Sequence, residues 1–179
     1  MVWFFGRRKA PKAATTETQL TPEFIARDLA TMLAGNMDSP EIVEVLAEAG
    51  ETYSPECRLE WLIINTFAAT QGFVASSLSE PFKQAFVPAF VKAVASLAFH
   101  KFEAREQFAA QFYERAQEYG PAHAASAENP ETLALLFGRR LTSTAAPGVI
   151  LFARGVFHKK LIAANQFANK IAAMATGSS

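Results

Sequence analysis

The sequence predicts an all-α, single-domain protein from three observations: recurrent helix-start signals, no sustained alternation of apolar and polar residues, and a high apolar content. The chain has 179 residues, of which 50% are hydrophobic and 16 are phenylalanine. This length suits one domain, and this apolar content excludes intrinsic disorder for most of the chain. Cys57 is the only cysteine, which excludes an internal disulfide and a thiolate metal cluster.

Four helix starts share one sequence pattern, in which a capping residue precedes a proline and then a glutamate. The cap oxygen accepts a hydrogen bond from a first-turn amide, proline lacks an amide that would otherwise be unpaired, and glutamate complements the positive end of the helix dipole. The pattern occurs at Thr21-Pro22-Glu23, Ser39-Pro40-Glu41, Ser54-Pro55-Glu56 and Asn129-Pro130-Glu131. Helix ends are predicted where glycine follows helical spacing, at Gly35, Gly50 and Gly120.

These signals and the apolar spacing predict a bundle of about six helices. We expect the helices over residues 22–33, 40–49, 55–77, 81–119, 130–141 and 147–174. We expect residues 1–20 to form a mobile basic and aromatic leader, residues 21–174 the helical domain, and residues 175–179 a disordered tail.

The fourth expected helix, residues 81–119, is the long central one. Pro88 predicts a kink or a division in it, because an interior proline removes one backbone hydrogen bond and clashes with the preceding turn. After Pro88 nothing interrupts the helical spacing before Gly120, so we expect this helix to run the length of the domain. Residues 120–129 then form a loop.

The third expected helix is apolar on nearly every side after Glu60, which predicts that other helices surround it. Its polar residues then need partners inside the protein, either ordinary helix contacts or a polar ligand in an apolar pocket. The candidate pocket residues are Asn65, Gln71, Phe67, Phe86 and Phe90. A row of phenylalanines is more often plain core, so the ligand pocket is the alternative interpretation.

The last expected helix is basic and amphipathic. At about 100° per residue its apolar side chains fall on one arc, and Arg154, Lys159 and Lys170 fall on the other. Only Lys160 interrupts the apolar arc, and its aliphatic stem can lead the charge outward. This polar arc suits the acidic early helices of the same bundle, an anionic membrane surface or an external acidic protein.

Charges are strongly segregated along the chain although the formal net charge is zero. Residues 1–12 hold four basic residues and no acidic one, residues 13–60 hold ten acidic and two basic residues, and residues 139–179 hold six basic residues and no acidic one. Either the two ends attract each other within the fold, or a basic surface faces an anionic partner.

The leader has the composition that points most directly to function. Bulky aromatic residues stand beside cations with no acid nearby, a combination that suits an anionic membrane surface, the groove of a partner protein, or packing on the leader's own domain. The residues concerned are Trp3, Phe4, Phe5, Arg7, Arg8 and Lys9.

No recognised catalytic pattern is present: the sequence lacks a phosphate-binding glycine loop, a zinc-protease motif and a nucleophile elbow. His100, His123 and His158 are scattered, and none stands at a catalytic spacing from a carboxylate or nucleophile. His100 and Glu103 have the reverse of the order that helical di-iron sites use, and this order occurs once. We therefore expect no catalytic residue, no metal and no cofactor. A catalytic set can also be assembled from distant positions without any motif, so an enzyme is a third interpretation.

Together these observations predict a non-catalytic interaction or accessory protein, a scaffold or adaptor that engages a protein assembly or a membrane surface through the leader and the last helix. Its partner is another protein or a second copy, or else an anionic membrane; nucleic acid is disfavoured because cations and aromatic residues are not interleaved and the pI is about 6.8. The alternative is a carrier or sensor of a hydrophobic small molecule. The apolar run of residues 1–5 is too short for a signal peptide, so we expect a cytoplasmic protein, with peripheral attachment to the inner membrane as a second location.

Overall fold

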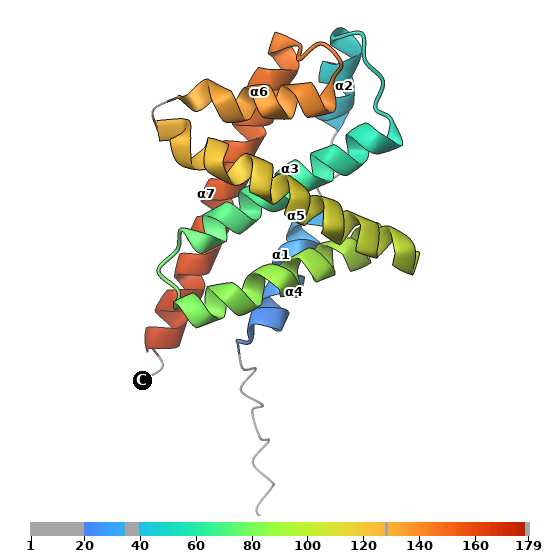
Figure 1. Ribbon diagram of the computed structural model, residues 1–179. Helices are drawn as coiled ribbons and strands as arrows, with labels where there is room; N and C mark the ends of the chain where they lie inside the picture. Colours follow the sequence, from blue (N-terminus) through green and yellow to red (C-terminus); the bar gives the residue numbers. More distant parts are fainter. Residues whose placement is uncertain (1–19, 35–39, 128, 178–179) are drawn as a thin grey trace, which may run out of the picture.

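Helices alone make up the regular structure of the part of the chain that the computed structural model describes, residues 20–34, 40–127 and 129–177 (Figure 1). The elements are α1 (Pro22–Ala34), α2 (Pro40–Glu48), α3 (Pro55–Val74), α4 (Glu80–Ala98), α5 (Phe102–Ala124), the 3₁₀ turn η1 (Ala125–Ala127), α6 (Pro130–Leu141) and α7 (Pro147–Gly177). The predicted all-α class is confirmed. The leader residues Trp3, Phe4, Phe5, Arg7, Arg8 and Lys9 lie outside the described residues.

Four helices begin at the prolines that the sequence singled out. Thr21 Oγ1 accepts a hydrogen bond from the Phe24 amide at 3.2 Å, and Ser54 Oγ accepts one from the Cys57 amide at 3.2 Å. Asn129 occupies the cap position of α6 without a side-chain hydrogen bond to the helix. Gly50 ends the second helix region with a φ of 75°, the left-handed conformation that glycine adopts without strain.

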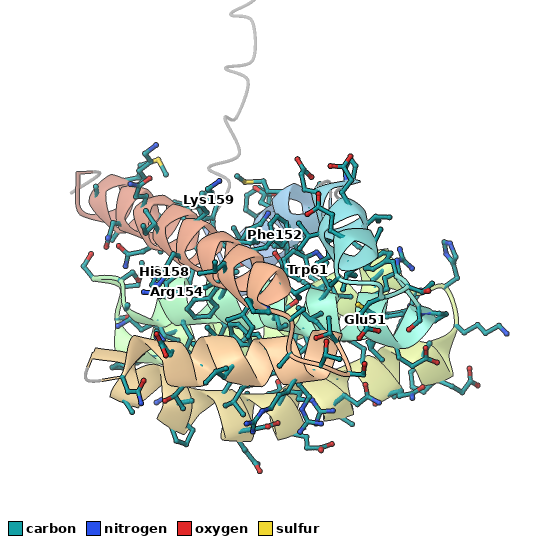
Figure 2. The ribbon with its side chains drawn as sticks, turned by 90° about the horizontal axis from the view of Figure 1, so that it is seen from above. Glu51, Trp61, Phe152, Arg154, His158 and Lys159 are labelled. Atoms are coloured by element: carbon teal, nitrogen blue, oxygen red, sulfur yellow. The ribbon has the colours of Figure 1, made fainter. Side chains whose placement is uncertain are left out.

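The central element is α3, in which every residue from Glu60 to Thr70 is buried. α7 and α5 cover opposite sides of it, and α4 and α6 also contact it, while α1 packs on α4 (Figures 1 and 2). The prediction that other helices surround this segment is confirmed. Its buried polar side chains bond within the helix: Asn65 Nδ2 donates to Trp61 O, and the hydroxyls of Thr66 and Thr70 donate to the carbonyl four residues earlier, each at 2.8 Å.

The predicted helix over residues 81–119 is divided, but not at Pro88. α4 continues through Pro88, which lies on its exposed side, and the break comes at residues 99–101, where Phe99 and Lys101 are extended. A continuous helix of that length would be nearly 60 Å long and would carry half of its apolar face away from the core. The break lets α4 and α5 pack on each other, with the rings of Phe99 and Phe108 5.8 Å apart.

Arg105 stabilises this break, because Nε donates to the Phe99 carbonyl at 2.7 Å and a terminal nitrogen donates to the His100 carbonyl at 3.3 Å. These carbonyls have lost their helical partners.

The predicted loop over residues 120–129 is also wrong in its first half, since α5 continues through Gly120 and Pro121 to Ala124. Tyr119 and Ala122 are buried on either side of Gly120, so tertiary packing stabilises the helix past that glycine.

α3 and α7 approach each other most closely at Gly72. A Cβ atom at this position would overlap the carbonyl oxygen of Leu161 in α7. Asn165 Nδ2 donates to the Gly72 carbonyl at 3.1 Å. One turn further along α7, Asn169 Oδ1 accepts hydrogen bonds from the amide and the hydroxyl of Ser77, each at 2.9 Å. These contacts define the register of α7 along α3.

We predict that Gly72→Ala lowers the free energy of unfolding by about 1–3 kcal/mol, because the new methyl group forces the two backbones apart. Gly155→Ala is the matched control: it lies in α7 with no heavy atom near the added Cβ, and it should raise stability by about 0.5–1 kcal/mol through higher helix propensity. Urea unfolding measures both. Equal effects of the two substitutions would show that α3 and α7 are not in close contact at Gly72.

Candidate interaction surface

The apolar face predicted for the last helix is the face by which α7 packs on the bundle. Its buried residues are Val149, Ala153, Phe157, Ala164, Ala168 and Ile171. The helix contacts α3, α6 and α2. Lys160 is half-buried, and burial lowers the pKa of its ammonium group. The predicted apolar arc is thus the packing face of α7, except that Ala163, which the angular count places on this arc, is exposed.

The opposite side of α7, which we call the outer face, carries exposed cations and exposed apolar groups together. Lys159 and Lys170 are exposed, and Leu151 and Ile162 remain 67% and 52% exposed. α7 contains no acidic residue. Arg154 and His158 lie on one flank of the helix and Lys159 on the other (Figure 2).

None of the cations of α7 forms an ion pair with the described part of the chain. α2 packs against α7, yet its fully buried residues are the apolar Ile42 and Leu46, while Glu44 and Glu48 are exposed. The acidic early segment and the basic last helix are therefore neighbours that meet through apolar contacts. Their opposite charges stay on the surface.

A polar link joins the loop after α2 to the loop before α7, and its partner in the second loop is a neutral serine. Glu51 Oε1 accepts hydrogen bonds from the Ser143 hydroxyl at 2.7 Å and the Ser143 amide at 2.9 Å, and these two bonds lower the pKa of Glu51. Nearby, the rings of Trp61 and Phe152 stack with centroids 5.6 Å apart (Figure 2). These contacts hold the start of α7 against α3 without using its cations.

The phenylalanines of the alternative ligand pocket belong to two separate aromatic groups. Phe67 packs near Tyr119 and Phe157, with ring centroids 5.6 and 6.0 Å away. Phe86 belongs to a different row, stacked between Phe73 and Phe90. Five surface hollows of the described residues have none of Asn65, Gln71, Phe67, Phe86 and Phe90 in their walls. The carrier interpretation stays a prediction.

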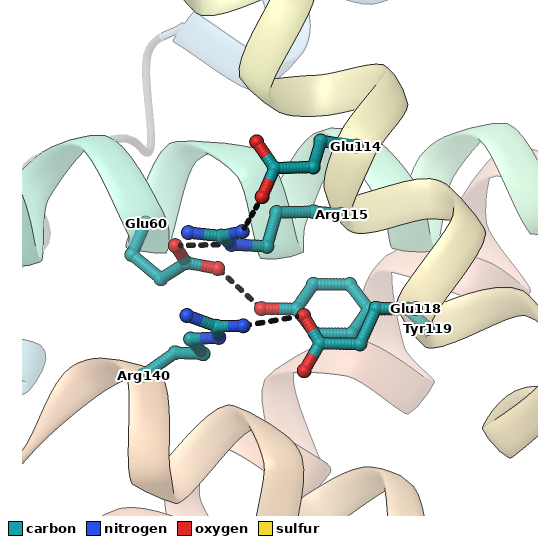
Figure 3. Close-up of polar contacts among 6 residues, drawn as sticks. All are labelled: Glu60, Glu114, Arg115, Glu118, Tyr119 and Arg140. Atoms are coloured by element: carbon teal, nitrogen blue, oxygen red, sulfur yellow. Dashed lines mark hydrogen bonds and ion pairs between the residues drawn. The ribbon is translucent and has the colours of Figure 1, made fainter.

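Sequence reasoning missed a network around the buried Glu60 that links α3 to α5, and a partly exposed ion pair that links α5 to α6 (Figure 3). Glu60, only 7% exposed, accepts a short hydrogen bond from the Tyr119 hydroxyl at Oε1 and a 3.1 Å bond from Arg115 Nε at Oε2. Arg115 also pairs with Glu114 at 2.9 Å, and Arg140 of α6 pairs with Glu118 at 2.8 Å. The sequence contained a signal for this network: the acidic Glu60 borders an apolar run, and Arg115 and Tyr119 are four residues apart, on one face of a helix.

This network suits a structural role more than chemistry. Burial raises the pKa of Tyr119 far above its usual range, and the negative charge of Glu60 raises it further. The Tyr119 hydroxyl therefore remains a hydrogen-bond donor. Burial, with the charges of Glu51 and Glu60, raises the pKa of Cys57 to about 11, so this cysteine stays a thiol rather than a reactive thiolate. An open groove of about 470 Å³ passes over the network, where Arg115 and Arg140 are already paired with carboxylates.

Comparison with known proteins gives no functional lead: no family model matches the chain, and no curated protein or solved structure is detectably similar to it. Within the described ranges, no three His, Cys, Asp or Glu side chains gather as metal ligands. The helices of the described residues include none long and apolar enough to cross a membrane.

We predict that Tyr119→Phe lowers the free energy of unfolding by about 1.5–3 kcal/mol, because it removes a hydrogen bond to a buried carboxylate. Tyr113→Phe is the control, since Tyr113 lies on the same helix with its side chain 43% exposed, and it should change stability by less than about 0.5 kcal/mol. Chemical unfolding compares the two. A Tyr119→Phe protein as stable as the control would refute the network's structural role.

We also predict that the double variant Lys159→Glu/Lys170→Glu unfolds within about 0.5 kcal/mol of the parent protein, at both low and high salt. Both side chains are exposed and form no ion pair with the described residues. Thermal unfolding at two ionic strengths tests this. A loss at low salt that shrinks at high salt would indicate internal attraction to the acidic helices.

Proposed function

We propose that this protein is a non-catalytic helical interaction protein, a scaffold or adaptor of the cytoplasm, which binds an acidic protein surface through the outer face of α7. One observation carries the proposal: an acid-free helix exposes cations without ion-pair partners among the described residues, beside exposed Leu151 and Ile162. Exposed apolar side chains supply contact area in an interface, and the cations select an acidic partner and accelerate its approach.

The neighbouring acidic surface favours a protein over a membrane as the partner. α2 contacts α7 and exposes Glu44 and Glu48. A flat anionic bilayer that approached Lys159 and Lys170 would also approach these carboxylates and be repelled by them. A protein surface can place basic groups opposite α2 and acidic groups opposite α7, so it can complement both.

The leader contributes aromatic anchors to the same proposal. Binding energy in protein interfaces concentrates in a few buried aromatic and arginine side chains, and residues 1–9 contain Trp3, Phe4 and Phe5 beside Arg7, Arg8 and Lys9. In this proposal Trp3 is the principal anchor, and the cations add electrostatic attraction.

A photo-crosslinking amino acid at position 162 tests the surface directly in cells. We expect one discrete adduct, lost in the Lys159→Glu/Lys170→Glu variant and retained in Lys92→Glu/Lys101→Glu, which changes the charge equally on exposed residues away from α7. Deletion of residues 1–9 should weaken the adduct, and Trp3→Ala should weaken it more than replacement of the three leader cations by alanine.

Two results would contradict the proposal. The first is an absent adduct, or an adduct that survives charge reversal on α7. The second is co-sedimentation with phosphatidylglycerol vesicles, but not with neutral vesicles, that disappears on the same charge reversal, because it would assign the outer face to an anionic membrane.

A further inference from the structure

A small hollow separate from the outer face lies where α5, η1, α6 and α7 meet. We call it the histidine hollow; its volume is about 50 Å³. Leu133, Phe137 and Phe157 supply apolar walls, and His123, Arg154 and His158 supply its titratable and charged side chains. Ligand pockets for drug-sized molecules occupy about 300–1,000 Å³, so this hollow suits a molecule much smaller than a drug.

The side-chain nitrogens that His123, Arg154 and His158 bring to the histidine hollow have no partner among the described residues. No acidic side chain is among its lining residues. The side chains of His123, Arg154 and His158 form neither a hydrogen bond nor an ion pair with the described residues, and His123 Nδ1 is buried without a partner. Buried polar atoms in folded proteins nearly always have partners, so the buried Nδ1 of His123 is the atom that calls for a ligand here. Arg154 is half-buried and His158 is exposed, so both also reach solvent.

The three side chains converge on one place. The ring of Phe157 lies 5.4 Å from the ring of His123 and 5.9 Å from that of His158, so both imidazoles flank the same apolar group. Arg154 lies one turn before His158 on α7, and the two share one flank of the helix (Figure 2). A ligand on Phe157 would therefore meet donors from α5 and from α7.

The electrostatics of the hollow favour a negative charge. Burial lowers the pKa of His123, and the charge of His158 lowers it further, so this imidazole is neutral at neutral pH. From α6 the hollow receives only Leu133, Ala134 and Phe137, and from η1 only the neutral Ser126, so no carboxylate offsets Arg154. An anion would interact favourably with the guanidinium group, and with the His123 imidazole once that ring is protonated.

We propose that the histidine hollow binds a small aliphatic carboxylic acid as its carboxylate, with the carboxylate at Arg154, His123 and His158 and the short alkyl group against Leu133, Phe137 and Phe157. A guanidinium group binds carboxylates in a fixed fork geometry. The apolar walls favour such an acid over inorganic phosphate, which has no apolar part to cover them. This inference stands independently of the partner proposed for the outer face of α7.

Titration of the full-length protein with sodium butyrate, followed by NMR of the histidine rings, tests this inference. We expect saturable shifts of the His123 and His158 resonances and little change at His100, which lies at the break between α4 and α5. Binding should raise the pKa of His123, so affinity should be higher at pH 6.0 than at pH 7.5. Butyramide, the neutral isostere, should bind at least tenfold more weakly.

Matched variants distinguish butyrate binding in the hollow from nonspecific attraction of butyrate to positive charge on the surface. Arg154→Gln should weaken butyrate binding about tenfold, while Lys92→Gln, which removes one exposed charge from α4, should leave it within twofold. Arg154 is half-buried, so the histidine spectrum of the variant also verifies that it is folded. The proposal is overturned by absent saturation, by equal binding of butyramide, by tighter binding of phosphate than of butyrate, or by unchanged binding in folded Arg154→Gln protein.

Discussion

The close approach of α3 and α7 at Gly72 is the constraint on which the rest of this structure depends. Because Gly72 has no side chain, the Leu161 carbonyl can lie directly against α3. Asn165 then bonds to the Gly72 carbonyl, and Asn169 bonds to Ser77 just beyond the end of α3. These contacts define one register for the 31 residues of α7. In that register Phe157 enters the core beside Phe67, and the cations of α7 that the sequence placed on its polar arc remain at the surface. The register of α7 along α3 therefore determines both which residues of α7 enter the core and which lie on its outer face.

Glu60 imposes a second constraint, on the rotation of α5. Arg115 and Tyr119 are four residues apart and both donate to this buried carboxylate, so one face of α5 must point at α3. His123 follows four residues later on the same face, which places its ring against Phe67 and Phe157. A buried ion pair is weak evidence for added stability, because desolvation of the charges offsets much of their attraction. Its clearer effect here is geometric, since it brings His123 to the flank of α7 that carries Arg154 and His158.

The errors of prediction along residues 81–129 have one physical origin. Proline inside a helix is a local signal, and Pro88 was expected to divide the segment, yet its ring lies on the exposed side of α4, where the helix continues past it. The actual break at residues 99–101 carries no glycine or proline; it occurs where α5 must turn back to reach α3 and α4. Gly120 was expected to end a helix, but the burial of Tyr119 and Ala122 outweighs its weak helix propensity.

The sequence by itself determined the helical class, the four proline-marked helix starts, the burial of α3 and the two arcs of α7, because caps and periodicity act between residues within a turn or two of each other. Only the tertiary structure decided that α2 and α7 meet through apolar contacts, with no ion pair from the α7 cations to the described residues, that Glu60 is paired with α5, and that His123 shares a hollow with Arg154 and His158. His123 and Arg154 are 31 positions apart in the sequence, and Glu60 and Arg115 are 55 positions apart. The acidic and basic segments are further apart still. Such residues meet only after whole helices have docked in one register, and that register depends on shape complementarity, which local sequence patterns do not encode.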